Sequence, residues 1–389
     1  MFQEKIKSSA AYSDTKPHYE LLDGLRGVAA LMVICYHVFE GFAFASGAPV
    51  ISGINHGYLA VDFFFILSGF VIGYAYDDRW GRTLTVRGFF KRRLIRLHPM
   101  VILGALIGTV SFVLQGSVQW DGTRVATSAV MWALLMAMFM IPAVPGCGYE
   151  VRGNGEMFPL NGPSWSLFFE YIGNILYALV LRRLSTKALL ALVCALGLSV
   201  AVFTCSDVSG YGMFGVGWTL DGMNFLGGSL RLLFPFTTGL LLSRVFKPFS
   251  VRGAFWICTL VLVVLFNVPY IAANDPICFN GLFESFCILI VFPLLIMLGA
   301  SGRTTDTFST RVCKTLGDLS FPLYIVHYPV MYYFYAWMMK TGRYTLADTW
   351  QISLCVVLGN VLLAWLCLKC YDEPVRRWLT RRFGGKCTA

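Results

Sequence analysis

The sequence predicts an all-α membrane protein, a polytopic transmembrane bundle of about ten helical crossings. Hydrophobic residues make up 57% of the 389 residues and charged residues only 13%, a composition that soluble domains do not have. The apolar residues come in runs long enough to cross roughly 30 Å of hydrocarbon. Short loops separate these runs, so no soluble domain of ordinary size fits between them.

Ten apolar runs reach that length, and one further run is shorter. We expect crossings over residues 21–45, 58–76, 98–118, 164–181, 187–205, 225–243, 253–272, 283–300, 313–339 and 350–371. The shorter run, residues 127–142, lies between two basic loops that an even number of crossings must separate. We therefore expect it to dip into the bilayer or to lie shallow in it.

Lysines and arginines orient these runs. They concentrate in loops 77–97, 182–187, 243–252 and 301–314 and in the tail from Lys369, whereas loops 45–57, 206–224 and 272–282 contain none. Because positively charged loops stay on the cytoplasmic side of a membrane, both termini are predicted to be cytoplasmic.

The same pattern predicts one membrane domain with two cytoplasmic extensions. The N-terminal segment covers residues 1–20, the transmembrane domain residues 21–371 and a basic tail residues 372–389. The net charge of +10 is divided among short loops, whereas binding of nucleic acid needs one continuous basic face. The lipid bilayer is therefore the expected partner, and nucleic acid is not.

The first run contains Asp23, Arg26 and His37 in the sequence LLDGLRGVAALMVICYH. A charged residue at membrane depth costs several kcal/mol, so it normally faces a cavity, a partner or a substrate path. Arg26 and His37 are about three turns apart on one helix face, roughly 16 Å from each other. Taken singly, Asp23 and Arg26 are also explained as a cap and a surface anchor, and His37 as a packed core histidine. Their common face favours a polar path from the membrane surface to its middle.

The second run places Asp62 among phenylalanines in YLAVDFFFILSGF, with Ser68 six residues further on. A carboxylate in such surroundings is desolvated, so its pKa should rise unless a cation such as Arg26 pairs with it. The alternative is a buried segment in which Asp62 only links two helices.

Arg92, Arg93 and Arg96 follow two aromatic residues in the predicted cytoplasmic segment RGFFKRRLIRLHP. Guanidinium groups bind phosphates through two hydrogen bonds at once. The segment therefore suits a donor such as coenzyme A, which carries a pyrophosphate and a 3′-phosphate. On composition alone, an anchor that only sets the topology is the better explanation.

The segment PSWSLFFE brings Trp165, Ser166 and Glu170 to the start of a later run. Ser166 and Glu170 are one turn apart, and Glu170 within an apolar helix needs a partner. The plainer interpretation of the serines in this segment is a helix cap. Neither is expected to act as a nucleophile, because no G-x-S-x-G elbow accompanies them.

Further polar groups lie later in the chain. Tyr324 and His327 share a helix face, which makes His327 a second candidate base or else a packed core residue. Asp221, Arg231 and Glu284 are close to the outer ends of their runs, where they are expected to line an acceptor entrance. No metal is expected, because the five histidines are scattered and lack ligand spacing.

These motifs together resemble the acyltransferase-3 family of integral membrane O-acyltransferases. The similar elements are the spacing of Arg26 and His37, the sequence VDFFFILSGF, the arginine segment, the SWS element ending in Glu170, and SFPLYIVH near the end of the chain. The last element departs in detail from the commonest form of the family, but the resemblance covers most of the chain.

The resemblance implies transfer of an acyl group, usually acetyl, from cytoplasmic acyl-CoA to a hydroxyl of a sugar-containing acceptor. Envelope polysaccharides, glycolipids and glycosylated natural products are the usual acceptors, and the expected location is the bacterial inner (plasma) membrane. His37 would act as general base. The other implied roles are donor positioning by Asp23 and Arg26, charge stabilisation by Asp62 or Glu170, acyl-CoA binding by Arg92, Arg93 and Arg96, and substrate contact by Ser68, Trp165, Ser166, Tyr324 and His327.

Two other classes of function remain open on the residues alone. A transporter or flippase for a glycolipid or small molecule would also need polar groups along a path, although the internal repeat common in transporters is not visible. A non-catalytic membrane scaffold would use the same polar groups only for packing.

Overall fold

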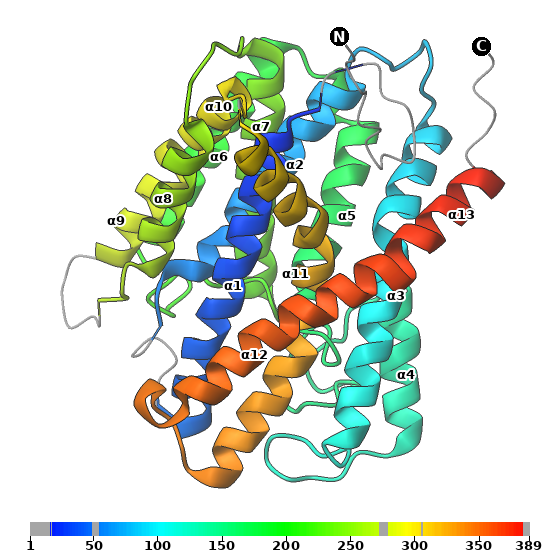
Figure 1. The fold of residues 1–389 in the computed structure, drawn as a ribbon, viewed down its shortest axis with the longest axis vertical. Coiled ribbons are helices and arrows are strands. Elements are labelled where there is room, and N and C mark those ends of the chain that lie inside the picture. The colour runs from blue at the N-terminus through cyan, green and yellow to red at the C-terminus, as the bar shows by residue number, and fades with distance from the viewer. Residues whose placement is uncertain (1–15, 17, 49–53, 272–278, 305, 384–389) are drawn as a thin grey trace.

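The computed structural model describes residues 16, 18–48, 54–271, 279–304 and 306–383, and these residues form helices without any β-strand. The helices are α1 (Glu20–Ser46), α2 (Ala60–Tyr76), α3 (Val86–Leu114), α4 (Thr127–Met138), α5 (Ser164–Leu179), α6 (Thr186–Cys205), α7 (Gly222–Val245), α8 (Ala254–Asn267), α9 (Phe279–Phe286), α10 (Phe292–Ser301), α11 (Thr307–Thr341), α12 (Leu346–Cys367) and α13 (Glu373–Phe383). The predicted all-α polytopic class is confirmed (Figure 1).

By length and composition, 8 helical stretches of the described residues can cross a bilayer. Two further predicted runs are also helical. Helix α8 has only 14 residues, about 21 Å, whereas α11 has 35 residues. Helices α9 and α10 are joined by a π-helical turn, Cys287–Val291, and together form one of the 8 stretches. Each of the ten predicted runs therefore contains a helix.

The shorter predicted run forms α4, which has 12 residues. Its length of about 18 Å is well below the thickness of a bilayer. Helix α4 lies beside α3 (Figure 1), and the loop that follows it returns to the middle of the bundle, where Gly162 and Pro163 line a cavity. This geometry agrees with a run that enters the bilayer without crossing it.

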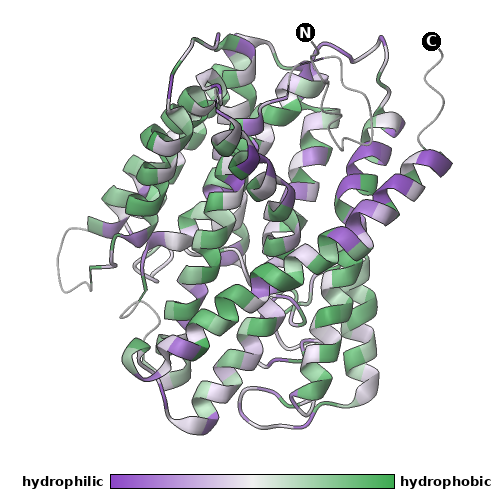
Figure 2. Ribbon diagram, in the orientation of Figure 1, coloured by the Kyte–Doolittle hydropathy of each residue, from purple (hydrophilic) through white to green (hydrophobic). Residues whose placement is uncertain are grey.

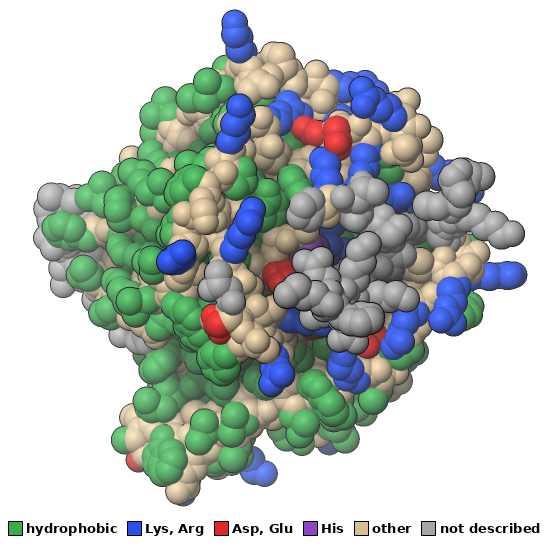
Figure 3. Space-filling model, turned by 45° about the horizontal axis from the view of Figure 1, so that its top comes forward, with side chains coloured by type: hydrophobic (Ala, Val, Ile, Leu, Met, Phe, Trp, Pro, Cys, Tyr) green, Lys and Arg blue, Asp and Glu red, His purple; other side chains and the backbone are tan. Residues whose placement is uncertain are grey.

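The beginning of α1 and the end of α13 lie at the same end of the molecule, the upper end in Figure 1. Hydrophilic residues gather towards this end and along α13 in Figure 2, and Figure 3 shows lysine and arginine side chains spread around it. Residues 373–383 of the predicted tail form α13, which continues from α12 through a π-helical turn, Leu368–Asp372. Most of the predicted segment 1–20 and residues 384–389 lie outside the described residues.

Small residues bring two helix pairs into close contact. A Cβ atom added at Gly27 of α1 would lie 2.3 Å from the carbonyl oxygen of Leu316 in α11, and one at Gly69 of α2 would lie 2.0 Å from that of Phe236 in α7. Helices pack this closely in membranes only where a small residue removes the side chain between them. The two contacts place the polar residues of α1 against α11 and those of α2 against α7.

The topology predicts which introduced thiols react from outside. In right-side-out membrane vesicles, Ser206→Cys at the outer end of α6 should react with a membrane-impermeant maleimide. Ser250→Cys, in the loop between α7 and α8 at the opposite end of the molecule, should react only after permeabilisation. Both serines are exposed, and the parent protein measures the background from its own cysteines. Labelling of Ser250→Cys in sealed vesicles would show that the orientation is inverted.

Candidate active site

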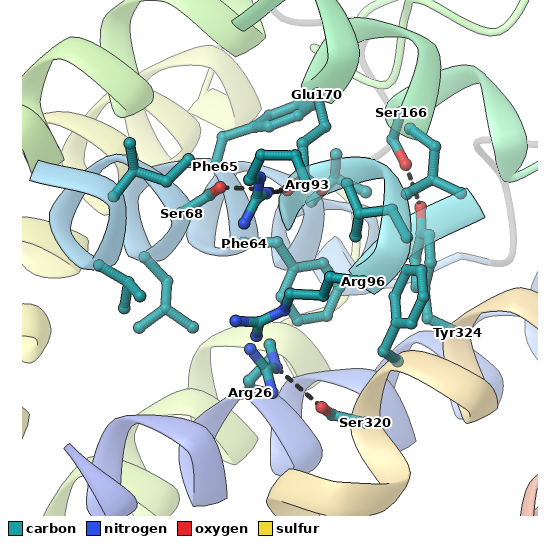
Figure 4. A pocket seen from close by; sticks show the side chains of 17 residues that line it. Arg26, Phe64, Phe65, Ser68, Arg93, Arg96, Ser166, Glu170, Ser320 and Tyr324 are labelled. Atoms are coloured by element: carbon teal, nitrogen blue, oxygen red, sulfur yellow. Dashed lines mark hydrogen bonds and ion pairs between the residues drawn. The ribbon is translucent and has the colours of Figure 1, made fainter. Parts of the chain in front are cut away.

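Two adjoining cavities lie inside the bundle. The inner cavity has a volume of about 100 Å³, and its polar lining consists of Arg26, Ser68, Arg93, Arg96, Ser166, Glu170, Ser320 and Tyr324 (Figure 4). The central cavity has a volume of about 570 Å³, and its lining includes His37, Glu40, Trp165, Arg231 and Tyr324. Val61 and Tyr324 line both cavities, so these two side chains belong to the wall between them.

Arg26 reaches the inner cavity from α1. Its Nε donates a hydrogen bond to Ser320 Oγ at 2.7 Å, and its guanidinium forms an ion pair with Asp23 at 3.1 Å. Asp23 thus lies one turn before Arg26 on the same helix and holds its guanidinium. Arg26 was one cation that could have paired with Asp62, but the structure pairs it with Asp23 on its own helix.

Arg93 and Glu170 form an ion pair across the inner cavity, with 2.6 Å between NH2 and Oε1. Ser68 donates a hydrogen bond to the same carboxylate at 3.2 Å. Three predicted residues from α2, α3 and α5 therefore meet at one point. The partner that Glu170 was expected to need is Arg93.

Arg96 also lines the inner cavity, and Figure 4 shows its guanidinium pointing towards that of Arg26. Arg92, on the same helix, is not part of the cavity lining formed by the described residues. Arg26 is paired with Asp23 and Arg93 with Glu170, so the guanidinium of Arg96 leaves this site with a net positive charge. Such a site suits a phosphate-bearing ligand.

Ser166 and Tyr324 are joined at the wall between the cavities. Their hydroxyl oxygens are 2.7 Å apart, and Ser166 Oγ donates to the carbonyl oxygen of Pro163 at 3.0 Å. Since the hydroxyl hydrogen of Ser166 is used in this way, Tyr324 is the donor to Ser166. Helix α5 begins without a side-chain cap, so neither serine has the capping role that was the plainer interpretation.

His37 and Glu40 form the polar centre of the central cavity. The distance between His37 Nδ1 and Glu40 Oε2 is 2.6 Å. The same carboxylate accepts hydrogen bonds from the hydroxyls of Tyr36 and Tyr335, each at 3.2 Å. Sequence reasoning missed Glu40, although its place three residues after His37 puts both side chains on one helix face.

This pairing determines how His37 presents its ring. A carboxylate at Nδ1 favours the tautomer with the proton on Nδ1, which leaves Nε2 as an acceptor. Among the described residues Nε2 has no hydrogen-bond partner, and the side chain of His37 remains 14% exposed. His37 can therefore take a proton from a hydroxyl group in the central cavity.

His327 lies behind His37 and is fully buried. Its ring centroid is 5.2 Å from that of His37, and its Nδ1 is 2.9 Å from the carbonyl oxygen of Tyr324. His327 does not belong to the lining that described residues give either cavity. The geometry thus favours His37 over His327 as the group that a substrate reaches.

Asp62 pairs with Arg231 of α7, with 2.7 Å between Oδ2 and NH2, and both side chains are buried. Arg231 also contributes to the lining of the central cavity, where the centre of its guanidinium lies 5.1 Å from the centroid of the Trp165 ring. Asp62 therefore neutralises the guanidinium of Arg231 and holds it in place. Glu284 is likewise buried and accepts hydrogen bonds from the hydroxyl of Tyr58 and from Phe214 N.

Glu156, in the loop before α5, is a buried carboxyl that sequence reasoning missed. It lines the central cavity and accepts hydrogen bonds from the Tyr332 hydroxyl and, at 2.8 Å, from Asn154 Nδ2. Burial raises the pKa of Glu156 to about 7, because desolvation disfavours the carboxylate. The surrounding sequence, RGNGE, looks like any polar loop and contains no sign of this burial.

Among the residues that the structure describes, no group of three His, Cys, Asp or Glu side chains is placed to hold a metal ion. The site instead combines a positive inner cavity with a histidine and carboxylate pair in the next cavity.

Comparison with known proteins decides the family. A family model described as an acyltransferase domain matches residues 19–369. The chain belongs to the acyltransferase-3 family. The motif resemblance is therefore confirmed, and this member is an acyltransferase within a membrane bundle.

Several relatives of this family member have curated names. "Acyltransferase MdmB" of Streptomyces mycarofaciens is 26% identical over 387 residues, 93% of this chain and 92% of that protein. "Peptidoglycan O-acetyltransferase OatA" of Listeria monocytogenes is 25% identical over 392 residues, 96% of this chain but only 58% of that protein. "Protein 2 in picA locus" of Rhizobium radiobacter is 34% identical over 165 residues, 41% of this chain and 80% of that protein. No solved structure matches the chain.

The pKa of Glu156 predicts a pH-dependent contribution to stability. The pKa is 4.5 for an ordinary Glu and about 7 in the folded protein, so between these values the folded state binds more protons than the unfolded state. The contribution of Glu156 to stability therefore falls as the pH rises through this window. Glu156→Gln lacks this titration, so its thermal midpoint in nanodiscs should rise relative to wild type between about pH 5 and pH 8.

A matched variant tests this assignment. Glu20→Gln changes an exposed carboxyl at the start of α1 and should track wild type over the same pH range. A difference between Glu156→Gln and wild type that stays constant with pH would contradict the assignment.

Proposed function

We propose that the protein transfers an acyl group, in the usual case acetyl, from cytoplasmic acyl-CoA to a hydroxyl group of a sugar-containing acceptor. The observation that supports this most is the arrangement of the cavities. The positive inner cavity and the cavity containing His37 are neighbours, because Val61 and Tyr324 line both. A donor and an acceptor bound on the two sides would meet at this wall.

The donor would bind from the basic end of the molecule. Arg96 is exposed while it lines the inner cavity, so it can hold a phosphate of coenzyme A at the opening. Arg26 lies further in, and Arg93 is neutralised by Glu170. Arg92, outside the described lining, would contact the nucleotide part only at the surface. The thioester would then point towards Tyr324.

The chemical step would use His37 as the general base. As the acceptor oxygen forms a bond with the thioester carbonyl carbon, His37 Nε2 takes the hydroxyl proton. The carbon–sulfur bond then breaks, and the proton passes from His37 to the departing thiolate of coenzyme A. Glu40 would hold the ring and stabilise its protonated form.

The acceptor would be a carbohydrate supplied from the outer side. The name of the Listeria relative, a peptidoglycan O-acetyltransferase, supports a polysaccharide acceptor. Envelope polysaccharides, glycolipids and glycosylated natural products share the required hydroxyl. Coenzyme A is cytoplasmic, so a basic donor face on that side is consistent with the bacterial inner membrane. A flippase would instead move its substrate without consuming a thioester.

Purified protein in nanodiscs tests this function with labelled acetyl-CoA and a panel of neutral glycans. Wild type should release coenzyme A and label a glycan. His37→Ala should lower kcat by roughly 10²–10⁴-fold, because general base catalysis is lost. Glu40→Gln should lower kcat by at least about tenfold with little change in the KM of acetyl-CoA, because the ring loses its orienting carboxylate.

His98→Ala is the matched control, since His98 lies on α3 outside the described lining of both cavities. It should retain activity. Wild type that neither releases coenzyme A nor labels any glycan would overturn the proposed function. Normal turnover by His37→Ala would overturn the role of His37.

The donor site has a separate test. Arg96→Gln should raise the KM of acetyl-CoA roughly tenfold or more, because one charge-assisted hydrogen bond to phosphate is lost. Arg87→Gln, an exposed arginine on the same helix outside the described cavity lining, should leave KM unchanged. Equal effects of the two substitutions would mean that the inner cavity does not bind the donor.

A further inference from the structure

The central cavity adjoins another cavity on the side that the positive-inside rule predicts to be outer. This outer cavity has a volume of about 700 Å³, and Asn154, Tyr211 and Trp218 line both cavities. We call these three residues the neck. An acceptor that moves from the outer cavity to the central one would pass the neck on its way to His37.

The neck is formed by two loops, one between α4 and α5 and one between α6 and α7, which hydrogen bonds join. Met157 N donates a hydrogen bond to the carbonyl oxygen of Trp218 at 2.9 Å, and Glu156 and Thr219 form an antiparallel bridge. On the other side, Gly212 N donates to Asp207 Oδ1 at 2.9 Å. These bonds hold the aromatic rings in place before a ligand arrives, which lowers the entropic cost of binding.

The neck presents aromatic rings that lack aromatic partners. Trp218 is 36% exposed and Tyr211 is 46% exposed, and within the described residues neither ring stacks on another. Trp120 lines the central cavity just inside the neck. A pyranose ring has an apolar face of C–H groups that covers such a surface, while its hydroxyl groups point sideways.

Hydrogen-bonding groups lie beside these rings. Trp120 Nε1 is a buried donor and Asn154 Oδ1 a buried acceptor, and neither has a partner among the described residues. An unpaired buried polar atom costs roughly 1–3 kcal/mol. A sugar hydroxyl is both donor and acceptor, so it can satisfy either atom. The cavity volume of about 570 Å³ is also in the range of small-molecule sites.

The charges near the neck disfavour an anionic ligand. The outer cavity is lined by Glu150 and Asp221 and, among the described residues, by no lysine or arginine. The arginine in the central lining, Arg231, is already neutralised by Asp62. Arg152 is a further buried cation, with the centre of its guanidinium 5.2 Å from the centroid of the Trp120 ring, but it belongs to the described lining of neither cavity. The carboxyl groups of Glu150, Glu156 and Asp221 outnumber it, so a phosphate or a uronic acid would meet an excess of negative charge.

We propose that the neck is a binding subsite for an uncharged pyranose ring, which stacks on Trp218 and Tyr211 and bonds through its hydroxyl groups to Asn154 and Trp120. The inference rests on the proposed function only in the direction it gives the acceptor, from the neck towards His37. Binding itself needs neither the donor nor turnover.

Saturation-transfer NMR on the full chain in nanodiscs, free of sugar detergents, tests the subsite. The probes are the methyl pyranosides of glucose, galactose and mannose, each compared with its own uronic acid. At least one neutral glycoside should bind, and its uronic acid should bind about tenfold more weakly. Trp218→Ala should weaken binding of the neutral glycoside about tenfold, whereas Trp218→Phe, which keeps a ring, should weaken it less.

Two further variants separate the subsite from general damage to the fold. Trp120→Phe keeps the ring but removes the N–H group, so it should weaken binding severalfold. Trp350→Ala removes an exposed tryptophan of α12 outside the described cavities and should leave binding unchanged. Both variants should elute as monodisperse protein.

The outcomes distinguish the subsite from the proposed function. No binding of any neutral glycoside, equal binding of the uronic acids, or unchanged binding by Trp218→Ala would overturn the subsite. Binding of octanol in place of sugars, lost in Trp218→Ala, would assign the neck to an acyl chain and also overturn it. Normal sugar binding without any acetyl transfer would overturn the proposed function and leave the subsite standing.

Discussion

The structure depends on one constraint, that a polar group at membrane depth must be paired or must face a cavity. Asp62 is paired with Arg231, and Arg93 with Glu170, each through contacts of 2.6–2.7 Å. The guanidinium of Arg96 and Nε2 of His37 have no ion-pair or hydrogen-bond partner among the described residues, and both side chains line a cavity. These two groups are therefore available to a ligand.

Close helix packing divides the interior of the bundle into separate cavities. The contact at Gly27 brings α1 against α11, and the contact at Gly69 brings α2 against α7. Between these two pairs, Val61 and Tyr324 separate a positive cavity from an aromatic one. An acyltransferase that joins a cytoplasmic donor to an outer acceptor needs such a division, since an open channel would leak ions and expose the thioester to water.

Much of the candidate site follows from sequence motifs, because each motif lies on a single helix. Arg26 and His37 were predicted to share a face, and each lines a cavity. Glu170 was predicted to need a partner, but the motif did not name Arg93. The motif allowed a cation such as Arg26 beside Asp62, whereas the partner is Arg231 of α7, because position in neighbouring runs says little about which helix faces which. Glu40 was missed although its spacing from His37 was visible.

The sequence by itself determined the helical class, the apolar runs and the basic side of the molecule, since these follow from composition and from local periodicity. Only the tertiary structure decided which charges pair, that Glu156 is buried in the central cavity, and that the loops carrying Asn154 and Trp218 meet at the neck. These features join residues from distant parts of the chain. The free energies of these contacts depend on burial and on the partner, and neither can be inferred from a local stretch of residues.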